Sequence, residues 1–256
     1  MARLNVLAFF AHPDDETMLA GGTLALLARQ GAAVTYLCAT RGEGGEMGEP
    51  PLCTLEELGA VREREMRCAA QALGAAGVEF LDYIDPRVGA DNTLYPYAEN
   101  VERLAEELRA VIDRLGIDVV ITHGSNGEYG HPAHVLSHSA ARLAVERSAQ
   151  ALPLLYSSNA CFPDHPKPRL ANKDDPAHLV IDIAPVLEQK IAAAMCHGTQ
   201  HALFVRNASK DAGRPMTVPE VIVPLESLHR HLPPVNGALD DPLAQLLRAS
   251  GQVREG

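Results

Sequence analysis

The feature of this 256-residue sequence that most constrains its fold is an alternation of short apolar runs with longer amphipathic stretches. Short runs rich in Val, Ile and Leu are typical of buried strands, and the longer stretches have the apolar spacing of helices. The expected strands are residues 4–11, 33–39, 78–81, 117–122, 153–157 and 178–183, and the expected helices are residues 16–30, 56–73, 99–115, 132–150 and 185–196. This order predicts an α/β fold with a mostly parallel sheet and helices on both faces.

The pattern weakens after about residue 201, where we expect one more strand at 220–224, a short helix at 225–232 and a loose tail at 250–256. Residues 40–54 and 158–177 show no clear element, and loops of that length in a compact domain tend to be functional. We find no internal repeat and no low-complexity linker, so the sequence predicts a single domain over residues 1–256.

Charge and composition exclude several classes of protein. A net charge of −11 and an aromatic content of 4% argue against a nucleic-acid-binding protein, which normally carries a basic surface and stacking aromatics. No run of eighteen apolar residues predicts a membrane span, and residues 4–11 are too short for a signal peptide. The five cysteines are scattered and form no CxxC pair, which predicts reduced thiols in a cytoplasm.

The first stretch with chemistry is AHPDDE at residues 11–16, between an expected strand and an expected helix. His12 and Asp15 are three residues apart across this turn, so both side chains can point to one side. An imidazole and a carboxylate together suit a divalent ion such as zinc. Asp14 must point elsewhere, which leaves it free to take a proton from water. The acids alone would be an ordinary helix start, because acidic residues cap and stabilise helix N-termini.

A second stretch has the same layout. The expected strand 117–122 runs into a glycine-rich loop that ends in His131-Pro132-Ala133-His134. Pro132 suits the first position of a helix, so His131 lies near the cap and His134 lies almost one turn later. His134 is a natural third ligand beside His12 and Asp15, and three protein ligands leave the fourth position that a hydrolytic zinc site needs.

The two stretches, AHPDDE at 11–16 and GEYGHPAH at 127–134, resemble the LmbE-like (PIG-L) family of zinc-dependent N-deacetylases. Weaker similarities lie in the loop 40–46, in Arg62-x-x-Glu65-Met66, in residues 82–85 and in Lys190 with His197-Gly198-Thr199-Gln200. The two paired motifs are specific, and the weaker places only support them.

The resemblance implies a Rossmann-like, three-layer α/β/α fold. It also implies hydrolysis of a linear amide C–N bond, with removal of an N-acetyl group from an amino sugar of the N-acetylglucosamine type or its conjugate. On the matching positions, it implies His12, Asp15 and His134 as zinc ligands and Asp14 as the general base. It further implies that His131 steadies the oxyanion or protonates the amine, that Tyr129 donates to the oxyanion, and that Arg62, Asp85 and Glu46 lie near the sugar. A homo-oligomer is compatible with this family.

Two positions depart from the family pattern. Ala133 stands where the family often has an aspartate that orients and charges the neighbouring histidine, which weakens a proton-donor role for His131. The family's Asp-Ser-Gly-Met is Asp85-Pro86-Arg87-Val88 in this chain, so the substrate rim is expected to differ.

Other functions stay open or are disfavoured. An amidase acting on a larger sugar conjugate would use the same residues. A non-catalytic metal-binding protein on this scaffold would need a fourth protein ligand, for which His123 and His197 are the candidates. The ligand set also admits iron, cobalt or manganese. A nucleotide site and a serine hydrolase are disfavoured, because neither GxGxxG nor GxSxG occurs at a suitable place.

Overall fold

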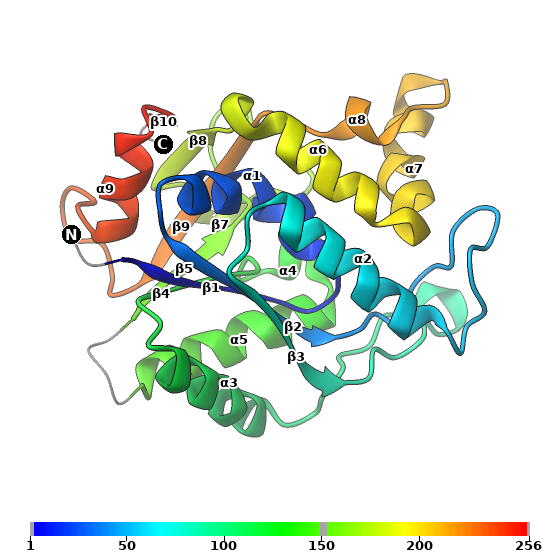
Figure 1. The fold of residues 1–256 in the computed structure, drawn as a ribbon, viewed down its shortest axis with the longest axis horizontal. Helices are drawn as coiled ribbons and strands as arrows, with labels where there is room; N and C mark the ends of the chain where they lie inside the picture. The colour runs from blue at the N-terminus through cyan, green and yellow to red at the C-terminus, as the bar shows by residue number, and fades with distance from the viewer. Residues whose placement is uncertain (1–2, 149–152, 255–256) are drawn as a thin grey trace.

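A mixed sheet forms the centre of the computed structural model, which describes residues 3–148 and 153–254 (Figure 1). Within that part of the chain the sheet has eight strands in the order β10-β8-β9-β5-β4-β1-β2-β3. The strands from β5 to β3 run parallel, whereas β9, β8 and β10 pair antiparallel with their neighbours. Their bounds are β1 Asn5–Phe10, β2 Ala33–Thr40, β3 Gly77–Tyr83, β4 Val119–Thr122, β5 Leu154–Ser158, β8 Leu179–Asp182, β9 Leu225–Leu232 and β10 Val253–Arg254.

Helices cover both faces of the sheet, as Figure 1 shows. One layer contains α1 (Asp15–Arg29), α2 (Leu58–Ala72), α6 (Leu187–Cys196) and α9 (Pro242–Ala249), and the other contains α3 (Val101–Leu115) and α5 (Pro132–Glu146). Alternate residues of β1 belong to two separate apolar clusters, one under each layer, because successive side chains of a strand point to opposite faces. The predicted three-layer α/β/α architecture is confirmed.

The order of the strands brings the two sequence motifs together. From β1 the chain adds β2 and β3 on one side and later returns to place β4 on the other side. The turns after β1 and β4 therefore leave the same edge of the sheet from neighbouring strands. Such a reversal in an open α/β sheet leaves a crevice at the carboxyl ends of the strands, where ligands bind.

The last third of the chain differs most from the prediction. Residues 225–232 form strand β9 and not a helix, and residues 218–221 form the short helix α8 (Val218–Val221) where a strand was expected. Leu225, Leu228 and Leu232 have helical spacing, but Glu226 between them is buried and accepts hydrogen bonds from Lys190 Nζ and from two N–H groups of α1. Because Glu226 is buried with hydrogen-bond partners, its charged side chain interrupted the apolar pattern of a strand. The sequence therefore did not indicate that this segment lies between two other strands.

Several elements were not predicted. Helices α7 (His201–Ala212) and α9, the 3-10 turns η1 (Ala90–Asn92) and η3 (Gly198–Gln200), and the short helix α4 (Gly127–Gly130) lie in stretches without a clear pattern. The 3-10 turn η2 (Ala184–Val186) takes the first turn of the helix expected at 185–196. The expected loop 158–177 contains a small two-stranded sheet of β6 (Ala160–Cys161) and β7 (Asn172–Pro176). In the tail, Val253 and Arg254 pair with β8, so that segment is not loose. The expected end of helix 132–150 lies outside the described residues.

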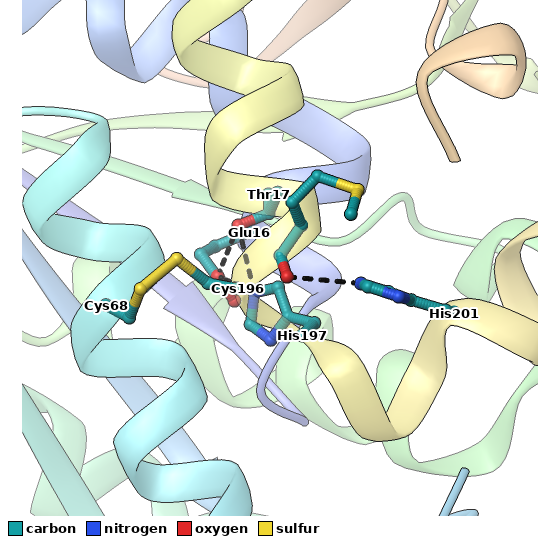
Figure 2. The surroundings of a disulfide bond; sticks show 7 residues. Glu16, Thr17, Cys68, Cys196, His197 and His201 are labelled. Carbon is teal, nitrogen blue, oxygen red and sulfur yellow. Dashed lines mark hydrogen bonds and ion pairs between the residues drawn. A yellow bond between two sulfur atoms is a disulfide. The ribbon is translucent and has the colours of Figure 1, made fainter. Parts of the chain in front are cut away.

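The prediction of reduced thiols is wrong for two of the five cysteines. Cys68 on α2 and Cys196 at the end of α6 form a disulfide, drawn in Figure 2, with their Cα atoms 5.8 Å apart. The two helices pack side by side, and this brings together residues 128 positions apart in the sequence. Cys38, Cys53 and Cys161 are free thiols. Over the described ranges, no helix combines the length and the apolar character needed to cross a membrane.

Candidate metal centre

A cavity of about 280 Å³ opens at the carboxyl edge of the parallel strands. Its lining includes all nine residues that the sequence singled out as site residues: His12, Asp14, Asp15, Glu46, Arg62, Asp85, Tyr129, His131 and His134. They come from the turn after β1, the loop after β2, helix α2, the loop after β3 and the turn after β4. The fold thus brings together residues that lie more than 120 positions apart in the sequence.

The turn after β1 gives Asp14 a backbone conformation that is rare for a residue with a side chain. Asp14 has a φ of 113°, and it immediately precedes helix α1. This conformation is strained outside glycine and persists only where surrounding contacts enforce it. Its N–H donates to Glu16 Oε2 over 3.1 Å, and its Oδ2 accepts from Arg62 Nη2 over 3.1 Å. The turn separates the carboxylates of Asp14 and Asp15, so that they have different partners.

The turn after β4 contains a second strained acidic residue. Glu128 has a φ of 60° and a ψ of −58°, again an unusual backbone for a residue with a side chain. Its N–H donates to Asn126 Oδ1, and its Oε1 accepts from the N–H of Gly124 over 2.8 Å. The other carboxylate oxygen lies 2.7 Å from His134 Nδ1. Glu128 was not among the predicted site residues, although its position in the motif between His123 and His131 was a usable signal.

Three side chains from the two turns bring four nitrogen and oxygen atoms to similar distances from one another. His12 Nδ1 is 3.2 Å from Asp15 Oδ2 and 3.4 Å from His134 Nε2, and His134 Nε2 is 3.4 Å from Asp15 Oδ1. Ligand atoms around a tetrahedral zinc ion, at bonds of about 2.0–2.1 Å, are about 3.3 Å apart. The two imidazoles therefore have the spacing of two corners of such a site, and each has one oxygen of the Asp15 carboxylate at a similar distance.

Both imidazoles of this cluster have a carboxylate on their second nitrogen. His12 Nε2 is 3.2 Å from Asp85 Oδ1, and His134 Nδ1 is 2.7 Å from Glu128 Oε2. Metal-binding histidines almost always donate their other N–H in this way, which fixes the ring and its tautomer. Asp85, expected near a sugar, therefore also holds His12 in place.

The electrostatics of the cluster favour a cation. Burial lowers the pKa of His12, but the hydrogen bonds and charges of Asp15 and Asp85 outweigh it and raise that pKa to about 10. Burial likewise raises the pKa of Asp15, yet the neighbouring imidazoles hold it well below its usual value. A buried pair of carboxylates around His12 requires compensating positive charge, which a metal ion supplies.

The candidate fourth ligands both have other partners, although His123 Nε2 also lies 3.5 Å from Asp15 Oδ2. His123 Nε2 accepts from the N–H of Ala11 over 3.0 Å, so its lone pair is used, and Nδ1 lies 3.1 Å from Glu128 Oε2. His197 Nε2 lies 3.3 Å from Thr17 Oγ1 and 3.4 Å from Glu16 Oε1, as drawn in Figure 2. Neither histidine belongs to the described lining of the cavity. This arrangement favours an open site over a closed structural one.

Asp14 has the surroundings of a general base. Burial raises its pKa, Arg62 lowers it and Asp15 raises it again, and the resulting pKa is about 7. A base is most effective when its pKa lies near the working pH. Arg62 is buried and its guanidinium donates to Asp14 Oδ2, to Pro13 O over 2.6 Å and to Gly42 O over 2.9 Å. Its contacts therefore fix the strained turn from the side of α2.

His131 and Tyr129 form the wall beside the cluster. His131 Nδ1 accepts from the N–H of Ala133 over 3.2 Å, so in the neutral ring Nε2 carries the proton and can donate it. Burial lowers the pKa of His131, and the neighbouring His134 and His12 lower it further, to about 3. The Tyr129 ring lies edge-on to His131 at a centroid distance of 5.7 Å. The backbone at Ala133 thus orients His131 without giving it charge.

Glu46 lines the cavity while its carboxylate is held by a neighbour. Arg206 on α7 donates to both carboxylate oxygens of Glu46 over 2.7 Å each, and Gln200 Nε2 donates to the Glu46 carbonyl. This pair joins the loop after β2 to the segment 198–212. The Glu46 carboxylate, which was expected to lie near a sugar, is therefore held by the Arg206 guanidinium.

A separate group of His and Asp lies outside the cavity. Asp175, His229 and His231 offer ligand atoms within 4.8 Å of one another. Their polar atoms already have protein partners: the Ser125 N–H and Asn172 Nδ2 for Asp175, the Pro176 carbonyl for His229 and Ser157 Oγ for His231. None of the three lines the described cavity. The other two groups of this kind share His134, one with His12 and His131 and the other with Asp15 and His123, so the turns after β1 and β4 hold the better candidate.

Fold and geometry together define an α/β protein with an open cluster of His and Asp side chains, which could hold a metal ion, at the switch point of its sheet. The family described as PIG-L, GlcNAc-PI de-N-acetylase, matches residues 7–145, which is just over half of the chain and includes both motifs. The chain belongs to the PIG-L family, and the predicted resemblance is confirmed.

Sequence identity and TM-score describe how similar the chain is to three known proteins. A 1D-myo-inositol 2-acetamido-2-deoxy-alpha-D-glucopyranoside deacetylase of Rhodococcus erythropolis is 40% identical over 159 residues, 57% of this chain and 54% of that protein. The 4-carboxy-2-hydroxymuconate hydratase GalB of Pseudomonas putida KT2440 is similar with a TM-score of 0.62 and 25% identity, over 93% of this chain and 100% of that one. The N,N'-diacetylchitobiose deacetylase of Pyrococcus horikoshii has a TM-score of 0.64 and 20% identity, over 93% of this chain and 90% of that one, which supports the fold alone.

The match to the first curated relatives is partial. The chain spans between 54% and 62% of the length of the first four, all named as deacetylases of the same glucosaminide.

Proposed function

We propose that this protein is a metal-dependent N-deacetylase that hydrolyses the acetamide of an amino sugar of the N-acetylglucosamine type. The observation that carries the proposal is the triangle of His12 Nδ1, Asp15 and His134 Nε2, with Asp14 beside it in one cavity. The names of the curated relatives support the reaction and the sugar, and an amidase acting on a larger conjugate is the nearest variant of it.

The proposed cofactor is zinc, held by His12, Asp15 and His134. Two imidazoles and a carboxylate near tetrahedral spacing suit zinc, and the same donors also accept iron, cobalt or manganese. When bound, the ion supplies positive charge that activates water and polarises the acetyl carbonyl.

The protein's own residues perform the proton transfers in this proposal. Asp14 takes the proton of the attacking water, because it lies in the cavity with a pKa of about 7. His131 Nε2–H and the Tyr129 hydroxyl donate to the oxygen on which charge develops, an effect often worth about 3 kcal/mol per donor. Protonated Asp14 then returns the proton to the nitrogen as the C–N bond breaks. The products are acetate and the free amine.

The sugar is proposed to lie against Arg62, Asp85 and Glu46, which share the lining with the metal cluster. Each of these side chains already has a protein partner: Asp14 for Arg62, His12 for Asp85 and Arg206 for Glu46. We therefore propose that they position the wall of the cavity and meet the sugar only through the polar atoms that these partners leave free.

A hydratase is the competing function, because the similar GalB is a hydratase at 25% identity. A carboxymuconate carries several carboxylates, so a site for it needs permanent positive charge on its wall. Among the described residues of the lining, Arg62 is the cation of that kind, and its guanidinium is committed to Asp14, Pro13 and Gly42. The carboxylates of Asp14, Asp15, Glu46 and Asp85 share the same lining, which favours an uncharged substrate.

The deciding experiment compares the two reactions on one preparation. The purified protein, with its metal content measured, is incubated with N-acetylglucosamine and its glycosides and assayed for acetate. A parallel sample with a carboxymuconate is followed by the loss of absorbance as a double bond is hydrated. Acetate release that a chelator abolishes and zinc restores supports the proposal. Hydration without acetate release, or bound metal with neither reaction, would refute it, and the latter would favour a non-catalytic metal-binding protein.

Three further expectations stay proposals. Residues 1–256 are proposed to act as one domain, since β10 near the end of the chain completes the sheet that β1 begins. The protein is also proposed to assemble as a homo-oligomer, and light scattering would measure its mass in solution. A cytoplasmic location was predicted from reduced thiols, and the Cys68–Cys196 disulfide weakens that argument because disulfides are rare in the cytoplasm. Titration of free thiols in fresh extract would test whether this disulfide forms in the cell.

A further inference from the structure

The mouth of the cavity has a different chemistry from its floor. Among the lining residues, the side chains of the metal cluster are buried and so form the floor, whereas the more exposed apolar side chains mark the mouth: Val88, Leu94, Tyr95, Tyr129 and Leu203. We call these five side chains the apolar rim. Val88, Leu94 and Tyr95 come from the loop after β3, Tyr129 from α4 and Leu203 from α7.

Exposed apolar surface is concentrated on this rim. Among the described residues, eight large hydrophobic side chains are well exposed, and four of them belong to the rim: Val88 at 51%, Tyr95 at 47%, Tyr129 at 60% and Leu203 at 45%. Single exposed apolar residues are normal, but a gathered patch around a cavity marks a binding surface.

The loop that carries most of the rim is ordered by its own contacts. The Gly89 N–H donates to the Thr93 carbonyl over 2.8 Å, which closes the loop. Tyr95 packs directly over Gly89, where a Cβ atom would lie only 2.6 Å from the phenol oxygen. A rim held in this way is available for a ligand without a large ordering cost.

The direction of the substrate follows from the proposed function, on which this inference rests. The acetamide must reach Asp14 and the metal cluster at the floor, so the group attached to the sugar extends towards the mouth. Among the described residues of the lining, Arg62 is the only permanent cation, and it is committed to the turn. Arg206 nearby is paired with Glu46, and the exposed Arg87 beside Val88 is not a lining residue. A phosphate or carboxylate that packs against the described lining would therefore find no uncommitted cation there.

We propose that the substrate is a glycoside of an N-acetylated amino sugar whose aglycone is an uncharged aryl or alkyl group that packs against the apolar rim. Burying about 100 Å² of apolar surface improves binding by roughly 10- to 100-fold. The same gain is expected in kcat/KM for an aromatic or alkyl glycoside over a glycoside with a minimal aglycone.

The test uses methyl, phenyl and octyl glycosides of N-acetylglucosamine with the same anomeric configuration, and it measures kcat/KM for acetate release by the metal-loaded protein. We expect phenyl and octyl glycosides to exceed the methyl glycoside by roughly 10- to 100-fold. Leu203→Ser and Val88→Ser, on separate segments, should each lower that ratio several-fold. Met195→Ser is the matched control, because Met195 is 46% exposed on α6 and lies outside the lining; it should leave the ratio unchanged.

The outcomes separate this inference from the proposed function. Equal kcat/KM for all three glycosides would overturn the apolar aglycone and leave the deacetylase intact. A rim substitution that changes the oligomeric state in light scattering and not the ratio would assign the rim to a second copy of the chain and likewise overturn it. No acetate from any glycoside would overturn both.

Discussion

The turn after β1 and the turn after β4 both contain a strained acidic residue, but its side chain has a different environment in each turn. Each forces an acidic residue into a positive-φ backbone, Asp14 at 113° and Glu128 at 60°. In the first turn the acidic side chain faces the cavity, whereas in the second it is buried behind His123 and His134. The Asp14 carboxylate is therefore available to substrate, whereas the Glu128 carboxylate supports the imidazole of a proposed metal ligand, His134.

The two carboxylates therefore have different roles, because Asp14 can react with substrate and Glu128 positions other side chains. A carboxylate in the cavity beside a buried arginine can gain and lose a proton, and its pKa of about 7 agrees with that task. For Glu128, burial raises the pKa, but the charge of His123 and the hydrogen bonds with His123 and His134 lower it to about 2, so it stays ionised. An ionised carboxylate behind two imidazoles holds their N–H groups and fixes their lone pairs.

The largest expected effect is on the first turn. Asp14→Asn should retain metal and lower kcat for acetate release by about two to four powers of ten, because the amide cannot take a proton from water. The measurement is kcat together with metal stoichiometry. Asp82→Asn is a matched control, since Asp82 also has a positive φ, of 61°, but pairs with Arg41 outside the cavity. Full activity in Asp14→Asn would remove the distinction between the two turns.

The next effect concerns the residue that the second turn presents to the cavity. His131→Ala should lower kcat by about 10²–10³-fold, the usual loss of one oxyanion donor. His131→Gln should recover much of that loss, because an amide N–H can replace the neutral Nε2–H. If His131 were instead an obligatory proton donor, glutamine would be as inactive as alanine, and the role inferred from the hydrogen bond between the Ala133 N–H and His131 Nδ1 would be wrong.

Glu128→Gln tests the supporting carboxylate. Loss of the charge behind His134 should weaken metal affinity by about 10- to 100-fold, with a smaller fall in kcat at saturating metal. Competition with a chromophoric chelator measures the affinity. Asp85→Asn is the parallel change behind His12. A large fall in kcat at saturating metal in Glu128→Gln would show that both turns contribute to the chemical step.

The sequence predicted most of the fold up to about residue 196, because its strands and helices have strong apolar periodicity and clear Gly or Pro boundaries. It failed at β9, where Glu226 is buried between strands and satisfied by Lys190 and by N–H groups of α1. A partner 36 positions away, or a disulfide across 128 positions, is invisible to local periodicity.

The site was predictable where it depended on short spacing. His12 and Asp15, and likewise His131 and His134, lie on turns that the strand order makes neighbours. What the sequence did not predict are contacts across the cavity: Asp85 on His12, Arg62 on Asp14 and Arg206 on Glu46. These pairs depend on where separate loops meet, and no pattern within one stretch specifies that.

The smallest expected effect isolates the backbone strain that the two turns share. Asp14→Gly and Asp14→Ala both lose the carboxylate, so their difference in stability reports the relief of the positive φ minus the entropy that glycine adds to the unfolded chain, and the same holds for Glu128→Gly and Glu128→Ala. We expect each glycine variant to be more stable than its alanine counterpart by about 1 kcal/mol, or roughly 2–4 °C in Tm, because only glycine adopts these angles without a clash. Asp85, which is not among the positive-φ residues, should show the opposite sign, since there glycine only adds entropy to the unfolded chain. Thermal unfolding of the six variants at one metal concentration measures all three differences. An alanine variant as stable as its glycine counterpart at position 14 or 128 would mean that the turn relaxes, and that strain is not what keeps its carboxylate in place.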